Sequence, residues 1–186
     1  MPEPVHIQPY NAGNQRPVVG LHPYDPRAPE VARAVAGLIN RVLPGVVVEH
    51  VGSTSVPGCA GKGIVDLMVL TDPTQLEAVT QAVDTLGFQP QSGGVIHGKD
   101  RPMREGSVSF DGAMHRLHVH IIPDGAPPVA LFRTFRDRLR ADTALLAEYV
   151  AHKERIVSGG AGTREEYSRA KAGFIQSVLQ GGNTGT

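Results

Sequence analysis

One carboxylate interrupts an otherwise apolar stretch of this chain. Asp66 is the only charged residue in GIVDLMVL, residues 63–70, whose aliphatic and β-branched side chains predict a strand. A carboxylate among apolar neighbours is costly unless it has a partner. Two interpretations stay open: backbone amides or an arginine satisfy Asp66, or Asp66 is a metal or substrate ligand positioned by a rigid element.

A loop rich in glycine and hydroxyl groups comes just before this strand. Gly52 ends the apolar run, and a glycine allows backbone N–H groups to approach an anion closely. Lys62 adds positive charge, and hydroxyl donors are offered by Ser53, Thr54 and Ser55. The loop differs from the Walker A pattern, because no Gly-Lys-Ser/Thr ends it. The segment therefore indicates either a phosphate-binding loop or an ordinary turn between two strands.

A second motif, HRLHVHII at residues 115–122, predicts a strand whose two faces differ in character. Because strand side chains alternate, Arg116, His118 and His120 share one face, opposite the aliphatic residues. A solvated face is one interpretation. If Asp66 lies on a neighbouring strand, the face forms a polar site for a ligand, and the two histidines with Asp66 form a site for a divalent metal.

Basic residues are also concentrated in FRTFRDRLRAD, residues 132–142. Helical spacing there predicts core contacts for Phe132, Phe135 and Leu139. Arg136 and Arg140 lie one helical turn apart, which would allow both to bind one phosphate, whereas a solvated basic face is the alternative. Lys153 and Lys171, on the predicted helices that follow, are further candidates for contact with a phosphate group.

The elements that must position these residues form an α+β pattern. Hydrophobic spacing predicts helices at 30–43 and 76–86 and strands at 46–51, 63–70 and 115–122. Residues 88–111 read as strands and turns, and the C-terminal third reads as helical. N-cap residues for three helices are predicted at Asp72, Asp142 and Thr163, the last with Glu166 in a capping box. We expect an α+β fold with a helical C-terminal third.

Size and composition indicate one domain. Lys+Arg and Asp+Glu are balanced at 18 each, which does not favour nonspecific nucleic-acid binding, and the single cysteine excludes an internal disulfide. No apolar stretch has transmembrane length, and MPEPVHIQPY does not resemble a signal peptide, so we expect a cytoplasmic protein without membrane contact. We expect an extended arm packed on the domain at 1–28, a single domain at 29–180 and a disordered tail at 181–186.

Several motifs, in the right order over nearly the whole chain, resemble those of the GrpB family. The most specific is EHVGSTSVPG followed by a lysine and IVDL, and the others are HPYDPRAPE, HRLHVH, LFRTFRDRLRAD and TREEYSRAKAGF. Two positions depart from the family pattern. Ala28 stands where a tryptophan is usual, and Gly63 stands where a proline is usual.

The resemblance implies a nucleotidyltransferase-like fold, with a mixed β-sheet flanked by helices. In that superfamily the Gly-Ser loop holds nucleotide phosphates, while an Asp-x-Asp pair and a third carboxylate bind metals. Gly52, Ser53 and Asp66 match this pattern. Met68 occupies the position of the second aspartate, and its thioether is a poor ligand for a hard cation.

Three hypotheses follow about function. The first is metal-dependent nucleotidyl or phosphoryl transfer, with Asp66 and Ser53 catalytic and Mg²⁺ or Mn²⁺ held by Asp66 with His118 or His120. The second is a catalytically degenerate ligand-binding or assembly module, related to coenzyme A or to nucleotides, as Met68 suggests. The third is a single-metal hydrolase that uses the His-x-His strand. In each case the expected partner is a small nucleotide or phosphate-containing molecule.

Overall fold

A computed structural model describes residues 5–10 and 19–181 of the chain. Parts of the expected arm and tail, residues 1–4, 11–18 and 182–186, lie outside the described residues. In the described part of the arm, Gln8 pairs with Ser107, and Tyr10 is buried. The division into arm, domain and tail stays a prediction.

The centre of the molecule is a five-stranded mixed sheet with the order β1-β2-β5-β4-β3. Its strands are β1 (Val47–Val51), β2 (Ile64–Thr71), β3 (Gln89–Pro90), β4 (Met103–Phe110) and β5 (Ala113–Pro123). The β2–β5 pair is parallel and the other pairs are antiparallel. The predicted α+β class and mixed sheet are confirmed.

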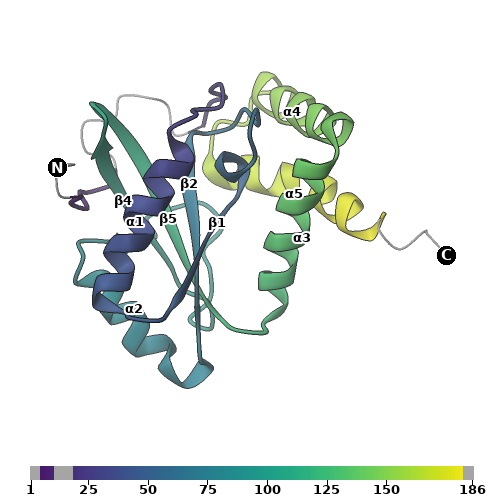
Figure 1. The fold of residues 1–186 in the computed structure, drawn as a ribbon. Helices are drawn as coiled ribbons and strands as arrows, with labels where there is room; N and C mark the ends of the chain where they lie inside the picture. The colour runs from purple at the N-terminus through teal and green to yellow at the C-terminus, as the bar shows by residue number, and fades with distance from the viewer. Residues whose placement is uncertain (1–4, 11–18, 182–186) are drawn as a thin grey trace.

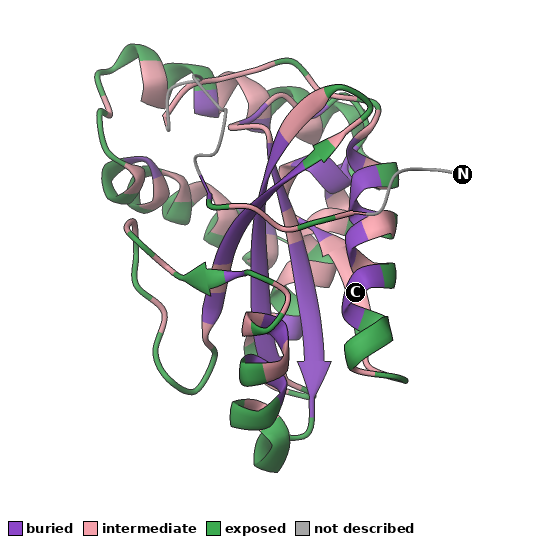
Figure 2. Ribbon diagram, turned by 90° about the vertical axis from the view of Figure 1, so that its left-hand side faces the viewer, coloured by how far each residue is buried: buried purple, intermediate pink, exposed green. Residues whose placement is uncertain are grey.

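Helices cover both faces of this sheet (Figure 1). One face packs on α1 (Ala28–Val42) and α2 (Leu76–Asp84) through a core of aliphatic side chains from all these elements. The helical C-terminal third comprises α3 (Pro127–Ala141), α4 (Thr143–Ser158) and α5 (Arg164–Gln180). Figure 2 shows the long central strands buried, while the helices expose their outer sides.

Successive side chains of β5 point to opposite faces of the sheet, and this alternation decides on which face each residue packs. Leu117, Val119 and Ile121 belong to the core under α1 and α2, as the sequence predicts. On the opposite face, His118 and His120 are each 9% exposed. The alternative of a solvated face is therefore wrong. This face packs instead beside a small apolar cluster that Met68 forms with residues of β1, β2, β5 and α3.

The predicted helix starts agree with the observed caps. Asp142 accepts hydrogen bonds from the backbone N–H groups of Ala144 and Leu145, and Thr163 forms a complete capping box with Glu166. Asp72 caps a 3₁₀ turn, η2 (Pro73–Gln75), which leads into α2. None of the helices in the described part is both long and apolar enough to cross a membrane.

Candidate functional site

The parallel pairing of β2 and β5 brings the lone aspartate beside the two histidines. Asp66 lies opposite His118 in the strand register, and His120 follows two residues later on the same face. Asp66 Oδ1 is 3.2 Å from His118 Nδ1 and 3.3 Å from His120 Nε2. Each residue offers one ligand atom, and the three atoms lie within 4.8 Å of one another.

These distances can be compared with those in a metal centre. Charge-assisted N–H···O⁻ hydrogen bonds are usually about 2.7–2.9 Å long. Ligand atoms about 2.0–2.1 Å from a tetrahedral metal are about 3.3 Å apart. The two separations at Asp66 Oδ1 are compatible with edges of a coordination polyhedron, and they also lie at the long end of ordinary N–H···O hydrogen bonds, about 2.7–3.2 Å.

Protonation states favour ligation by neutral imidazole. Burial lowers the pKa of His118, opposed by its hydrogen bond to Asp66. Burial raises the pKa of Asp66, but the hydrogen bonds from His118 and His120 together outweigh this effect. The net pKa of Asp66 therefore lies below its usual range. Around neutral pH the site thus offers a carboxylate and an uncharged His118 ring.

Tyr10 fixes the other side of His118. Its hydroxyl lies 3.1 Å from His118 Nε2, and the two rings stack with centroids 5.5 Å apart. Burial, with the nearby charge of Glu105, raises the pKa of Tyr10 to about 12, so the phenol keeps its proton. In the metal-free site Tyr10 donates to Nε2, and Nδ1–H donates to Asp66. Metal at Nδ1 would move that proton to Nε2, which then donates outward, as metal-bound histidines usually do.

The Gly-Ser loop approaches Asp66 from the side away from the histidines. Gly52 adopts φ 71° and ψ −172°, and a Cβ atom there would stand 2.5 Å from Asp66 Oδ2. The next three residues form the 3₁₀ turn η1 (Ser53–Ser55), in which Ser55 donates to the Gly52 carbonyl at 2.6 Å. The Thr54 hydroxyl donates to the Ile64 carbonyl at 3.0 Å and so ties the loop to β2.

Two lysines lie at the end of the site nearest α5. The ammonium groups of Lys62 and Lys171 are 5.2 Å and 4.8 Å from the centroid of the Tyr167 ring. Burial lowers the pKa of both amines, and burial with the charge of Lys62 lowers that of Lys171 to about 8. Asp66 acts on both electrostatically, so the lysines share the environment of the Asp66–His118–His120 cluster.

The other predicted phosphate ligands have protein partners. Arg136 donates to Glu49 at 3.1 Å and to the His50 carbonyl, whereas Arg140 donates to the Ser55 carbonyl at 2.7 Å. The two arginines thus hold α3 against β1 and the loop at separate points. Their joint contact with one phosphate stays a prediction that the observed contacts do not favour.

Two further predicted ligands also contact the protein itself. Lys153 is fully buried, donates to the Ala60 carbonyl and lies 3.2 Å from Cys59 Sγ, which fastens α4 to the loop before β2. The Arg116 guanidinium lies 5.6 Å from the centroid of the Tyr10 ring. Arg116 therefore lies near His118, which Tyr10 also contacts, while Lys153 has a structural position behind the loop.

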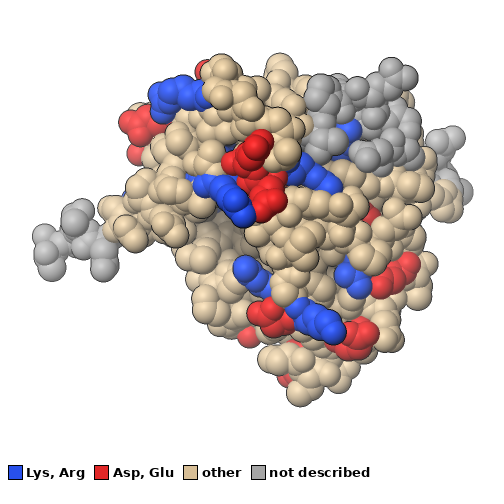
Figure 3. All heavy atoms as spheres, turned by 180° about the vertical axis from the view of Figure 1, so that it is seen from behind, with Lys and Arg blue, Asp and Glu red and all other residues tan. Residues whose placement is uncertain are grey.

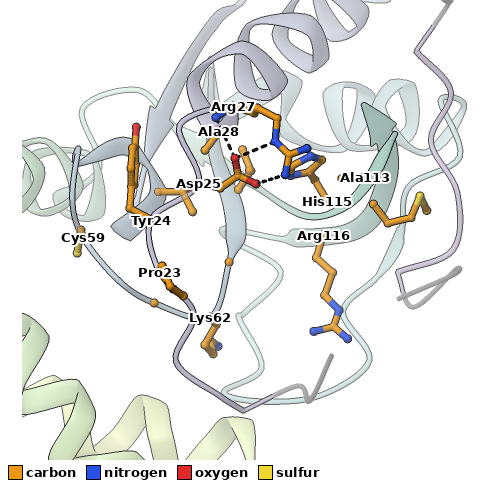
Figure 4. Close-up of a pocket in the computed structure, with 15 residues that line it drawn as sticks. Pro23, Tyr24, Asp25, Arg27, Ala28, Cys59, Lys62, Ala113, His115 and Arg116 are labelled. Carbon is orange, nitrogen blue, oxygen red and sulfur yellow. Dashed lines mark hydrogen bonds and ion pairs between the residues drawn. The ribbon is translucent and has the colours of Figure 1, made fainter. Parts of the chain in front are cut away.

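A cavity of about 30 Å³ lies at the N-terminal ends of β2 and β5 (Figure 4). Asp25 and Arg27 form a bidentate pair on one side of it, and Lys62 and Arg116 point away from that pair. This volume is enough for a water molecule or two and too small for a nucleotide. Asp66, His118 and His120 are not among the residues that line the cavity, whereas Lys62 and Arg116 are.

Sequence reasoning missed several residues around the cluster. Glu105 on β4 lies opposite His118 in the register and is 1% exposed, with Arg164 2.6 Å away. Tyr10 comes from the arm, and His97 comes from the loop before β4, where its ring contacts His120. Glu105 alone gave a signal, a carboxylate within the strand-like segment MREGSVSF.

The donor set does not fit a two-metal magnesium site. Met68 is completely buried in the apolar cluster, and Glu105 is occupied by Arg164 and by Ser92, whose hydroxyl donates at 2.6 Å. One carboxylate remains with two imidazoles. That set suits one divalent transition metal, since imidazole is a typical ligand of zinc, iron and nickel, whereas magnesium prefers oxygen ligands.

Comparisons with known proteins agree on the fold. The family model described as GrpB protein matches residues 18–181. The chain is 33% identical over 163 residues to a UPF0157 protein of Streptomyces coelicolor, covering 86% of this chain and 82% of that protein. It is 28% identical over 180 residues to a UPF0157 protein of Halalkalibacterium halodurans, covering 95% and 86%.

Solved structures give the same result. The crystal structure of GrpB from Enterococcus faecalis superposes with a TM-score of 0.71 at 23% identity, covering 87% of this chain and 96% of that one. A structure of the Cid1 poly(U) polymerase with MgGTP bound gives 0.52 at 17% identity, covering 80% of this chain and 50% of the polymerase. The fold is therefore nucleotidyltransferase-like.

Proposed function

The chain belongs to the GrpB family, and we propose that it binds a nucleotide or another phosphate-containing ligand together with one divalent metal ion. One observation carries the proposal. The Asp66 carboxylate faces His118 and His120 with one oxygen and the backbone of Gly52 with the other. The Asp66 side chain thus contacts both the proposed metal position and the loop suited to phosphate.

Each group has a defined part in this proposal. Asp66, His118 and His120 hold the metal, which polarises a phosphoryl oxygen when it is bound. Backbone N–H groups of the loop donate to the phosphate, as glycine permits a close approach, whereas the hydroxyls of Thr54 and Ser55 already donate to backbone carbonyls. Lys62 and Lys171 supply two further positive charges, which suits a ligand with more than one phosphate group.

The proposed chemistry is binding with single-metal activation of a phosphoryl group. Ordinary two-metal nucleotidyl transfer is disfavoured, because Met68 replaces the second carboxylate and lies in an apolar cluster. That same observation favours a second candidate, a binding module without turnover. Release of pyrophosphate or phosphate from a nucleoside triphosphate distinguishes them, since only the first candidate produces it steadily.

Binding itself is tested by thermal unfolding with nucleoside phosphates and coenzyme A precursors, each with and without Mn²⁺, Zn²⁺ or Mg²⁺. A ligand at 100 times its Kd stabilises the folded protein by about 2.7 kcal/mol. Asp66→Asn keeps the shape of the side chain and should abolish the metal-dependent stabilisation. Glu148→Gln removes the same charge from an exposed position on α4 and serves as the control. Equal metal responses of both variants would overturn the proposal.

A further inference from the structure

A buried thiol and a buried amine are in contact behind the Gly-Ser loop. Cys59, in the segment before β2, is 2% exposed, and Lys153, on α4, is completely buried. The Lys153 Nζ atom lies 3.2 Å from Cys59 Sγ. Lys153 also donates to the Ala60 carbonyl and lies 4.2 Å from the centroid of the Tyr149 ring. A completely buried lysine is rare in proteins, and here its amine is held against a nucleophilic sulfur atom.

The cavity shown in Figure 4 offers room for a small molecule beside this thiol. Cys59 is one of the residues that line the cavity, whereas Lys153 is not, so the amine contacts the sulfur atom from outside the cavity. The volume of about 30 Å³ holds one or two water molecules. Hydrogen peroxide is about the size of two water molecules and fits the same space. A peroxide in the cavity and the amine of Lys153 would therefore meet the sulfur atom from different sides.

Oxidation of this thiol leaves few chemical outcomes. A thiol oxidised by peroxide becomes a sulfenic acid, which then condenses with a second thiol or with a nitrogen atom. Cys59 is the only cysteine of the chain, so a second thiol within the protein is absent, and the nitrogen at 3.2 Å belongs to Lys153. Burial lowers the pKa of Lys153, although Cys59 opposes this shift. The lowered pKa favours the uncharged amine, whose lone pair can attack sulfur.

We propose that hydrogen peroxide converts Cys59 and Lys153 into a covalent sulfenamide bridge that joins the segment before β2 to α4. In the first step one peroxide oxygen is transferred to the Cys59 sulfur, which gives S–OH, and water is released. In the second step the Lys153 nitrogen attacks sulfur, the S–N bond forms, and the S–O bond breaks. The hydroxyl group leaves as water with a proton from the nitrogen.

The net reaction oxidises the sulfur atom and reduces the peroxide to water. The thiol and the amine each lose one hydrogen atom, and both peroxide oxygens end in water. The bridge goes beyond the proposed function, in which neither Cys59 nor Lys153 takes part. Its effect would be to fix α4 to the segment that leads to Lys62, three residues after Cys59.

Mass spectrometry of the folded protein treated with hydrogen peroxide and then digested tests this. We expect a pair of peptides linked through Cys59 and Lys153, lighter than the two separate peptides by two hydrogen atoms, or about 2 Da. Dithiothreitol should restore the free thiol. Because the bridge joins positions that are 94 residues apart, the oxidised protein should also unfold at a higher temperature than the reduced protein. A linked pair that retains an oxygen atom would overturn the direct S–N bond.

Three variants separate the bridge from ordinary oxidation. Cys59→Ser removes the thiol and should give neither the linked peptides nor the rise in unfolding temperature. Lys153→Met keeps an unbranched side chain without the amine, so Cys59 should instead stay a sulfenic acid that dimedone traps. Lys99→Met removes an exposed lysine and should form the bridge as the wild type does.

Thermal unfolding of the reduced proteins checks that each variant is folded. If Lys153→Met does not fold, the comparison of the wild type with Cys59→Ser decides, since the linked peptides identify both bridged residues. The proposal is wrong if Cys59 of the wild type gains only oxygen atoms, as Cys59 of Lys153→Met should, or if peroxide leaves Cys59 unmodified.

Discussion

Gly52 lies so close to Asp66 that a Cβ atom at position 52 would stand 2.5 Å from Asp66 Oδ2. The backbone of Gly52, with φ 71° and ψ −172°, is in a region that essentially only glycine adopts. The loop and the aspartate strand are therefore fitted to each other. One carboxylate oxygen faces the loop while the other faces the histidines.

This contact predicts a severe effect of Gly52→Ala. The substitution combines backbone strain with a clash against a charged side chain, so we expect the free energy of unfolding to fall by on the order of 2–4 kcal/mol. Displacement of Asp66 should also weaken Co²⁺ binding. Gly45→Ala is the matched control, because Gly45 has φ 82° but open space around its Cβ position. It should cost only about 1–2 kcal/mol and leave metal affinity intact. Similar losses of both properties in the two variants would contradict the contact.

Lys171 predicts a pH dependence of phosphate binding. Its pKa of about 8 means that the ammonium form is lost as the pH rises through this value, and its attraction for anions is lost with it. The affinity for ATP, measured by calorimetry without metal, should therefore fall by up to about 10-fold between pH 7 and 9. In Lys171→Arg the charge persists, so this decrease should disappear.

Lys99→Arg tests whether the effect is local. Lys99 is exposed in the loop before β4, and its substitution should leave the pH dependence of the wild type. If Lys171→Arg shows the same decrease as the wild type, another group carries the pH dependence.

Local patterns predicted the parts of the site that lie on regular strands. The alternation of β5 was enough to place His118 and His120 on one face, and the apolar run around Asp66 was enough to predict β2. The nearness of these strands followed from the family resemblance, and the structure confirms it. The apolar neighbours of Asp66 predict backbone amides or an arginine as its structural partners, whereas the observed partners are His118 and His120.

Other parts depended on contacts between distant segments. His97 and Tyr10 come from a loop and an arm without hydrophobic periodicity, so no local signal places them near β5. Arg136 and Arg140 are one turn apart, as predicted, but Glu49 and the Ser55 carbonyl accept their hydrogen bonds. The helix pattern specifies the spacing of the arginines, while the packing of α3 on β1 decides what they bind.

The ion pair between Arg164 and the buried Glu105 predicts a large loss of stability when Arg164 is replaced. Its guanidinium is 2.6 Å from Glu105 Oε1, and Glu105 is 1% exposed. Arg164→Met would leave a buried carboxylate with Ser92 as its remaining close donor, at a cost of about 3–5 kcal/mol. Urea unfolding measures the loss. The double variant Glu105→Gln/Arg164→Met removes both charges and should recover part of it.

A surface pair provides the comparison. Arg169 and Glu165 form an exposed i,i+4 pair on the same helix at 2.6 Å, and Arg169→Met should cost no more than about 0.5 kcal/mol. Equal losses for Arg164→Met and Arg169→Met would show that the buried pair does not stabilise α5 against the sheet.

His50 is held neutral in the folded protein by its position behind the loop. Its Nε2 atom lies 3.0 Å from Thr54 Oγ1, and the Thr54 hydroxyl donates to the Ile64 carbonyl. Nε2 must therefore carry the proton and donate to Thr54. Burial lowers the pKa of His50 to about 4, from 6.5 in the unfolded chain.

The lowered pKa of His50 predicts a specific loss of stability in acid. Between pH 6.5 and 4 the unfolded chain binds the proton and the folded protein does not, so stability is complete above pH 6.5 and falls toward pH 4. The loss from His50 is at most about 3 kcal/mol. His50→Gln keeps an N–H donor without the titration, so its free energy of unfolding in urea should decrease less between pH 7 and 5. Identical decreases in both proteins would show that His50 does not carry this acid sensitivity.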